Sequence, residues 1–485
     1  MMPAPDAVVV GSGPNGLAAA VVLARAGLQV ELREAAAEVG GGLRSAHLFD
    51  SEVLHDICAA VHPMAAASAF FREFDLRARG VELIQPEIAY AHPLDDGRAG
   101  LAYADLERTC DRLGPDGARW RRLMAPLVRR SQGLVDLLLS DLRRPPVDPL
   151  AAAMLPPRVL AQGTPLARHL FRGPEAPALL AGVAAHAVGR LPSLPSAATT
   201  LLLGHLAHGT GWPLPRGGSR RIAAAMVDDF VAHGGVVHTG CPLTALRELS
   251  GVPAVLLDLG PRGLLDVAGP QLPPGYRRRL EAYRYGPGVV KADFLVSEPV
   301  PWKNPALGLA GTVHLGGDQR AVFAGENAMV RGSRTDDPLV LLVDPMAQDD
   351  SRGRPGKRPV WAYCHMPPGD GADAGELITA QIERFAPGFT DTVLACRSVT
   401  APGMAAYNPN YVGGDIGAGA VTVRQLFARP VPRWNPYRTP LGGVYLCSAA
   451  TPPGPGVHGM NGYFAACSAL RHEFGIRTPP SLAPA

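Results

Sequence analysis

The stretch VVVGSGPNG, residues 8–16, decides the fold, because it joins a β-branched apolar run to three glycines spaced G-x-G-x-x-G. The spacing alone is weak in a chain with 56 glycines, so the flanking residues carry the argument. Residues 6–10 predict a buried strand. Residues 17–26 are rich in Ala, Leu and Val and predict a helix, with Gly27 at its C-terminal end. The motif therefore lies on a strand-turn-helix.

In this setting each glycine has a physical role. Gly11 permits the tight turn, Gly13 lets the backbone approach a pyrophosphate, and Gly16 lets the helix pack close to the strand. A second predicted strand, residues 29–33, ends at Glu34, where a carboxylate accepts a hydrogen bond from a ribose hydroxyl. A carboxylate there repels a 2′-phosphate, so the unit favours NAD or FAD over NADP.

A second glycine turn, EVGGGLRS at residues 38–45, follows directly. Many FAD proteins place such a turn against the flavin diphosphate, whereas NAD-only dehydrogenases do not need one. The sequence therefore favours FAD as the cofactor.

The bulk composition excludes several classes of protein. The 46 basic and 43 acidic residues leave a net charge of only +3, which gives no sign of a nucleic-acid partner. The seven cysteines contain no C-x-x-C pair and no zinc spacing, so we expect no metal, no disulfide-reductase chemistry and a reduced compartment. No apolar stretch reaches about 20 residues, so we expect no transmembrane span and a cytoplasmic protein.

Four later segments set the organisation of the chain. Residues 113–217 alternate apolar helical runs with prolines and predict a helical insertion. Residues 219–232 predict a helix and 236–240 a strand, which can extend the nucleotide sheet. GPGVVKADFLV, residues 286–296, predicts a strand, and the chain ends with a strand at 444–447, a glycine-proline loop and a helix.

These elements predict an α/β fold with a Rossmann-type FAD-binding domain and a discontinuous α+β substrate domain, built from a mixed sheet plus a helical insertion. The predicted FAD-binding domain comprises residues 1–75, 213–268 and 435–485. The predicted substrate domain comprises residues 76–212 and 269–434, with the insertion at about 113–212.

With these segments in place, nearly the whole chain resembles the phytoene desaturases and their relatives. These relatives include the animal pyridine nucleotide-disulfide oxidoreductase domain-containing protein and many actinobacterial FAD-dependent oxidoreductases, and the fold is related to that of the amine oxidases. The resemblance rests on VVVGSGPNGLAAAVVLARAG (8–27), on Glu34 with Gly40 and Gly41, and on HDICAAVHP, PRGGS, YGPGVVKADF, GGDI and SAATPPGPGVHGMNGYFAA (448–466).

The resemblance implies an extended FAD and assigns residues to it. The diphosphate would lie against Gly11, Gly13, Pro14, Asn15 and Gly16, the ribose against Glu34, and the flavin side against Gly40 and Gly41. Leu243 would contact adenine through its backbone. A helix starting near Gly459 would aim free N–H groups and its positive end at the flavin ring, with Gly456, Val457, Gly459, Met460 and Asn461 as the ring-side residues.

The chain departs from related patterns at two places. Many FAD proteins carry Gly-Asp where this chain has Ser448-Ala449-Ala450. Animal relatives follow GGNI with Phe-His, whereas Gly417-Ala418 follow here, which puts in doubt a histidine base at that point.

Three residues are candidates for catalysis, each with an ordinary alternative. His458 lies in the C-terminal glycine loop, where it either acts near the flavin or caps the loop. Lys291 shares one strand face with Asp293, and that face meets either a cavity or solvent. Asp415 is an active-site candidate in a turn that also favours Asp for its geometry. His55, Asp56, Cys58 and His62 match no zinc spacing and indicate a structural loop near the flavin.

The sequence thus favours an FAD-dependent oxidoreductase that removes hydride from an apolar or mixed organic substrate. No later G-x-G-x-x-G follows a strand, so reoxidation by oxygen, a quinone or another direct acceptor is expected. Two alternatives stay open: a redox-neutral FAD-dependent isomerase, and a non-catalytic lipid or prenyl carrier. The insertion carries Arg129, Arg130, Arg143, Arg144, Arg158, Arg168 and Arg172 among apolar residues, which leaves peripheral membrane contact open.

Overall fold

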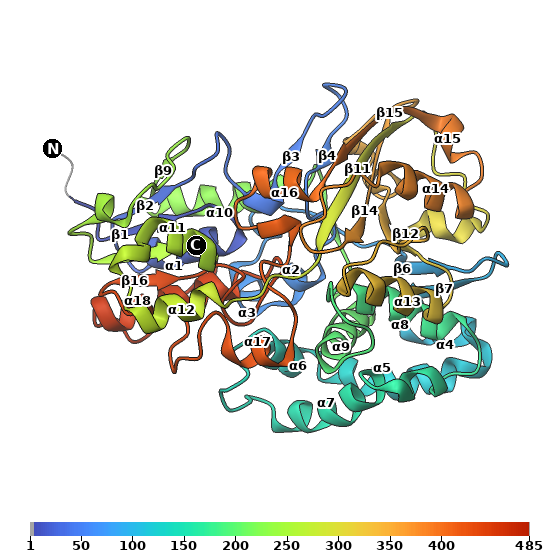
Figure 1. Ribbon diagram of the computed structural model, residues 1–485, viewed down its shortest axis with the longest axis horizontal. Helices are drawn as coiled ribbons and strands as arrows, with labels where there is room; N and C mark the ends of the chain where they lie inside the picture. The colour runs from blue at the N-terminus through green and yellow to red at the C-terminus, as the bar shows by residue number, and fades with distance from the viewer. Residues whose placement is uncertain (1–3, 485) are drawn as a thin grey trace.

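Strand β1, Ala7–Val10, runs through the middle of a five-stranded parallel sheet in the computed structural model, which describes residues 4–484 (Figure 1). The strand order is β16-β10-β1-β2-β9. The neighbours of β1 are β2 Val30–Arg33 and β10 Ala254–Leu257, and the edge strands are β9 Val236–His238, beside β2, and β16 Val444–Leu446, beside β10. All four pairings are parallel, so the carboxyl ends of strands from both halves of the chain meet at one edge.

Helices cover both faces of this sheet. Ala7 and Val9 pack with α1 Pro14–Arg25, α10 Arg220–Ala232 and α18 Met460–Glu473. Val8 and Val10 point the other way, toward α11 Pro261–Ala268 and α12 Pro274–Glu281. A strand buried on both faces needs a continuous apolar run, which is what β1 has.

A seven-stranded mixed sheet forms the second domain, beside the first in Figure 1, with the order β15-β11-β14-β13-β12-β6-β7. Only β12 and β6 pair in parallel. The strands are β6 Ile88–Pro93, β7 Ala99–Tyr103, β11 Gly288–Val296, β12 Ala310–Leu315, β13 Val340–Val343, β14 Arg358–Met366 and β15 Val393–Val399. Helices α14 Gly375–Phe385 and α15 Phe389–Thr392 share a hydrophobic core with it.

A helical insertion adjoins this sheet in the lower part of Figure 1. It comprises α4 Leu106–Arg112, α5 Gly117–Arg129, α6 Ser131–Leu138, α7 Pro149–Gln162, α8 Glu175–Ala185 and α9 Leu194–His208. The helices therefore begin at Leu106, before the predicted start at 113. The side chain of Asp105 caps α4, a local signal that a search for Arg and Pro content overlooks.

The remaining elements are short apart from α13 Gln319–Val330, which packs near α8. The other helices are α2 Pro63–Ala67, α3 Ala69–Phe74, α16 Ala401–Tyr407 and α17 Val423–Ala428. The two-residue strands are β3 Ser45–Ala46, β4 His55–Asp56, β5 Leu83–Ile84 and β8 Leu214–Pro215.

The predicted α/β class, with a parallel nucleotide sheet and a separate mixed sheet, is confirmed. The predicted helix at 219–232 is α10, and the final strand and helix return to the first sheet as β16 and α18. Helix α1 begins at Pro14 rather than Leu17, because proline suits the first helical position. Strand β10 was not predicted.

Across residues 4–484, no helix is both long enough and apolar enough to cross a membrane. Several of the arginines in the insertion make internal contacts. Arg130 pairs with Asp148 at 2.9 Å and Arg143 with Asp141 at 2.7 Å, while Arg144 lies over the ring of Phe464.

Candidate active site

The two glycine turns pack against each other at the carboxyl end of β1. A Cβ on Gly16 would lie 2.0 Å from the Gly11 carbonyl oxygen, and a Cβ on Gly41 would lie 2.9 Å from the Gly13 Cα. Gly40 donates its N–H to the Ser12 carbonyl at 3.0 Å. No other residue type fits these contacts, so the turns form a backbone cradle at the N-terminus of α1.

The Asp258 carboxyl occupies the mouth of this cradle. It follows β10 directly, and its Oδ2 accepts a hydrogen bond from the Gly16 N–H at 3.1 Å. The same oxygen lies 2.7 Å from the position of a Cβ on Gly13. Burial raises the pKa of Asp258 to about 8, and the negative charge of Glu34 contributes to the rise. The group is therefore an uncharged carboxylic acid at neutral pH.

The Glu34 carboxylate links several residues of the cradle through hydrogen bonds and an ion pair. Its Oε2 accepts from the Ser12 N–H at 3.0 Å and from the Ser12 hydroxyl, and its Oε1 accepts from the Ala36 N–H at 2.8 Å. The Arg44 guanidinium pairs with Oε1 at 3.1 Å. Leu243, the predicted adenine contact, is half-buried beyond β9.

The N-terminus of α18 meets the N-terminus of α1. A Cβ on Gly462, in the first turn of α18, would lie 1.8 Å from the carbonyl oxygen of Asn15, in the first turn of α1. The free N–H groups and positive dipole ends of both helices therefore face the same region. The Oδ1 atoms of Asn15 and Asn461 are buried there with no hydrogen-bond partner in residues 4–484.

His458 braces the loop before α18. Its Nδ1 accepts from the Met460 N–H at 3.1 Å, so the ring proton is on Nε2, which lies 3.2 Å from the Gly454 carbonyl oxygen. Burial lowers the pKa of His458 to about 4, which keeps the ring neutral. Both ring nitrogens are engaged within the loop, so His458 caps the loop, the second of the two roles considered for it.

A cavity of about 420 Å³ leads from the cradle into the second domain. At the cradle end, the predicted cofactor residues that line it are Gly13, Pro14, Asn15, Gly456 and Val457. At the far end its walls are mainly apolar and aromatic side chains from α6, α9, the loop after α9 and the mixed sheet, among them Leu138, Leu202, Trp212, Leu341, Trp361 and Tyr363. One space thus connects a nucleotide cradle to an apolar pocket.

Asp415 and Lys291, the other two catalytic candidates, differ in their relation to this cavity. Asp415 lines it, but its oxygens accept N–H bonds from Gly286 at 2.6 Å, Gly417 at 2.8 Å and Gly419 at 2.9 Å. Burial raises the pKa of Asp415 despite these bonds. The carboxyl group therefore holds a turn at the cavity wall.

Lys291 is buried and is not a cavity-lining residue. Its Nζ pairs with Asp293 and lies 5.6 Å from the centre of the Trp361 ring. The expectation that this strand face meets a cavity or solvent is therefore wrong. Both charges are compensated inside the protein, between the mixed sheet and its neighbours.

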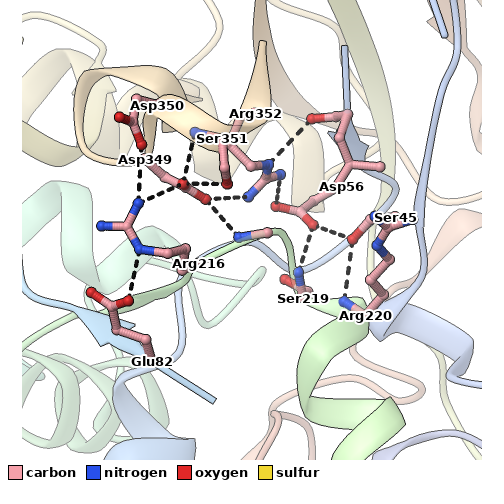
Figure 2. A network of polar contacts seen from close by, with 12 residues as sticks. Ser45, Asp56, Glu82, Arg216, Ser219, Arg220, Asp349, Asp350, Ser351 and Arg352 are labelled. Carbon is pink, nitrogen blue, oxygen red and sulfur yellow. Dashed lines mark hydrogen bonds and ion pairs between the residues drawn. The ribbon is translucent and has the colours of Figure 1, made fainter. Parts of the chain in front are cut away.

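The HDICAAVHP segment joins the two domains (Figure 2). Asp56 pairs with the fully buried Arg352 at 2.5 Å and accepts from the Ser45 hydroxyl at 2.6 Å and the Ser219 N–H at 2.9 Å. His62 Nε2 lies 2.8 Å from the Ser219 hydroxyl oxygen. In residues 4–484 no three His, Cys, Asp or Glu side chains are arranged to hold a metal ion, and all seven cysteines are free.

Three residues of the site escaped prediction. Arg44 and Asp258 lie in the cradle, and Arg429 lies in the cavity wall. An acid directly after the buried run Ala254–Leu257 was a signal for Asp258, because the carboxyl ends of parallel strands meet at the ligand site. No comparable signal marks Arg429, which stands in a segment with the composition of a surface loop.

The parallel sheet, the glycine cradle and the connected cavity define a Rossmann-type fold with a candidate nucleotide site. Residues 9–74 match the NAD(P)-binding Rossmann-like domain family. The chain is 25% identical to pyridine nucleotide-disulfide oxidoreductase domain-containing protein 2 of Rattus norvegicus, over 96% of this chain and 93% of the relative.

Two solved structures share the fold at low sequence identity. An oxidoreductase from Methanosarcina mazei is 15% identical with a TM-score of 0.59, over 96% of this chain and 99% of the other. Cyclohexylamine oxidase from Brevibacterium oxydans is 15% identical with a TM-score of 0.58, over 98% of this chain and 100% of the other. Both likenesses extend over the two domains.

Proposed function

We propose that the protein is an FAD-dependent oxidoreductase that removes hydride from a largely apolar organic substrate. The observation that carries this proposal is the single cavity that runs from the glycine cradle to the apolar pocket. It allows a dinucleotide bound along the cradle to present its reactive ring to a substrate in the pocket.

The residues of the cradle fit FAD. The Gly13 and Gly16 positions admit no side chain, which suits close approach of a diphosphate to the α1 N-terminus. The unpartnered Oδ1 atoms of Asn15 and Asn461 suit hydroxyl or N–H donors of a ligand. Glu34 would accept a further hydrogen bond from a ribose hydroxyl, and Asp258, being uncharged, does not repel the diphosphate at neutral pH.

When bound, FAD supplies a hydride acceptor at N5. The protein contributes position and electrostatics. The N-terminus of α18 directs N–H groups and positive potential toward the ring, which favours the negative charge of the reduced form. The apolar walls hold a C–H bond of the substrate in place. Desaturation also releases a proton from the neighbouring carbon, and a water molecule in the cavity would accept it.

Absorption spectroscopy of the purified protein tests the proposal. We expect flavin bands near the wavelengths of free FAD, a stoichiometry of about one FAD per chain, and bleaching under anaerobic conditions when a substrate is added. Colourless protein that takes up no FAD on reconstitution would refute it. The mass of the product separates desaturation from the isomerase alternative, since only desaturation removes two hydrogens.

A further inference from the structure

A buried arginine, Arg429, lines the cavity. It follows α17 directly, and only 2% of its surface is exposed. Its wall neighbours from the same segment include Val421 and Leu426. The guanidinium group is therefore enclosed by protein at the cavity wall, where little solvent screens its charge.

The guanidinium nitrogens of Arg429 have few hydrogen-bond partners within the protein. Its Nη2 makes two long hydrogen bonds, at 3.3 Å to the Tyr283 hydroxyl oxygen and 3.3 Å to the Gly419 carbonyl oxygen. Its Nε is buried and has no partner in residues 4–484. The Asp415 carboxyl of the same wall is near enough for its charge to interact with the guanidinium, but it makes no ion pair with Arg429 in residues 4–484, and its oxygens accept from three backbone N–H groups.

Another buried arginine of the protein has the charge partner that Arg429 lacks, although its Nη1 also has no hydrogen-bond partner in residues 4–484. Arg352 is fully buried, pairs with Asp56 at 2.5 Å, lies 4.0 Å from Asp349 and donates to the Leu54 carbonyl oxygen at 3.3 Å (Figure 2). The buried Lys291 likewise has Asp293. A buried charge without such a partner is strongly unfavourable unless a ligand supplies the opposite charge.

We propose that Arg429 binds a carboxylate group of the substrate, so that the enzyme acts on apolar carboxylic acids. This inference rests on the proposed function, since it names the substrate class of the same cavity. The planar fork of a guanidinium matches a carboxylate, and a single cation balances a single negative charge. The apolar walls then receive the hydrocarbon part of the acid.

The flavin is the other possible source of negative charge. A Cβ on Gly454 would lie 2.3 Å from the Arg429 Nη1, so the guanidinium touches the loop that leads to α18. The N-terminus of α18 already serves the electron-rich edge of the ring in the proposed site, which leaves Arg429 for the substrate. The experiment separates the two.

Binding of octanoate, octanamide and octylamine to the FAD-loaded protein tests the proposal. Trp212 and Trp361 line the cavity, so their fluorescence reports occupancy whether or not flavin is bound. We expect wild-type protein to bind octanoate at least about tenfold more tightly than octanamide, and octylamine most weakly. Arg429→Gln lowers octanoate affinity by about 10- to 100-fold and leaves octanamide affinity unchanged.

Two further variants control for charge and geometry. Arg424→Gln removes an exposed arginine from α17, the helix that precedes Arg429, and leaves octanoate binding unchanged. Arg429→Lys keeps the charge without the fork and gives intermediate affinity. If Arg429→Gln does not fold, the ligand series with wild-type protein and the Arg429→Lys variant still test the proposal.

Equal affinity of wild-type protein for octanoate and octanamide would overturn the proposal. So would an Arg429→Gln variant that binds octanoate normally but forms a weaker flavin adduct with sulfite, because the guanidinium then serves the cofactor. Failure of the proposed function looks different: octanoate still quenches tryptophan fluorescence, but the protein retains no flavin.

Discussion

Asp258 places a carboxyl group where a cofactor diphosphate would approach the backbone. The fit depends on its protonation, because burial and the adjacent Glu34 both favour the neutral acid. The Gly16 N–H opposes this by stabilising the ionised form. The cradle therefore contains a group whose charge changes in a range of pH that is accessible to experiment.

We expect FAD affinity to fall by about tenfold as the pH rises from 7 to 9, because ionised Asp258 repels the diphosphate. Asp258→Asn keeps the shape of the side chain and removes this dependence. Quenching of FAD fluorescence at a series of pH values measures both proteins. The same pH dependence in the variant would exclude Asp258 as its origin.

The stability of the apoprotein should follow the same titration. The pKa of Asp258 is raised in the folded state from an ordinary value of 3.8 to about 8, so the folded protein holds a proton that the unfolded chain has released. The free energy of unfolding therefore falls as the pH rises from about 4 to about 8 and is level above that range. Asp258→Asn should lack this component in urea titrations.

At the scale of elements, the contact between α1 and α18 aligns the two helix N-termini that face the proposed cofactor site. Gly462 makes it possible, since a Cβ there would lie 1.8 Å from the Asn15 carbonyl oxygen and 2.9 Å from the Ala19 nitrogen. Backbone atoms cannot give way as side chains do. The helices must separate if anything larger than hydrogen occupies this position.

Gly462→Ala is expected to lower the free energy of unfolding by about 1–3 kcal/mol through overpacking, and to weaken FAD binding as the helices separate. Gly275→Ala in α12 is the matched control, because it also changes a helical glycine and meets no atom within 4 Å. Urea denaturation and FAD titration measure both. A variant as stable as the control would show that α18 can move without cost.

The sequence predicted the elements that carry strong local signals. The glycine spacing placed β1, α1 and β2, and the proline and apolar patterns placed most of the helical insertion. Strand β10 was missed because its four apolar residues could belong to any short buried segment. Its position between β1 and β16 depends on packing between distant segments, which no local sequence pattern indicates.

Site residues were predictable only where one motif defines the chemistry. Glu34 follows from its distance to the glycines, whereas its bond to Arg44 depends on the path of the second turn. His458, Lys291 and Asp415 were singled out by residue type, but the first two have their polar atoms engaged inside the protein and the third holds a turn. Arg429 depends on tertiary packing alone.

For the whole molecule, the cofactor site draws on both ends of the chain, so bound FAD should stabilise the complete nucleotide domain. At a free FAD concentration of 100 times the dissociation constant, linkage predicts a gain of about 2.7 kcal/mol. The melting temperature should rise with FAD concentration. Gly13→Val fills the cradle beside Asp258 and should abolish the rise, so a rise that persists in this variant would move the site elsewhere.

The order in which the chain is synthesised affects how the domain that contains β1 folds in the cell. The ribosome releases β1 and α1 early, but β16, an edge strand of the same sheet, and α18, which packs on α1, lie at residues 444–473. The nascent N-terminal segment therefore exposes the apolar face of α1 through almost the whole of translation. All strands and helices of the mixed sheet and the helical insertion are synthesised before β16, the last strand of the nucleotide sheet. The nucleotide sheet, which contains the early strand β1, is therefore completed last.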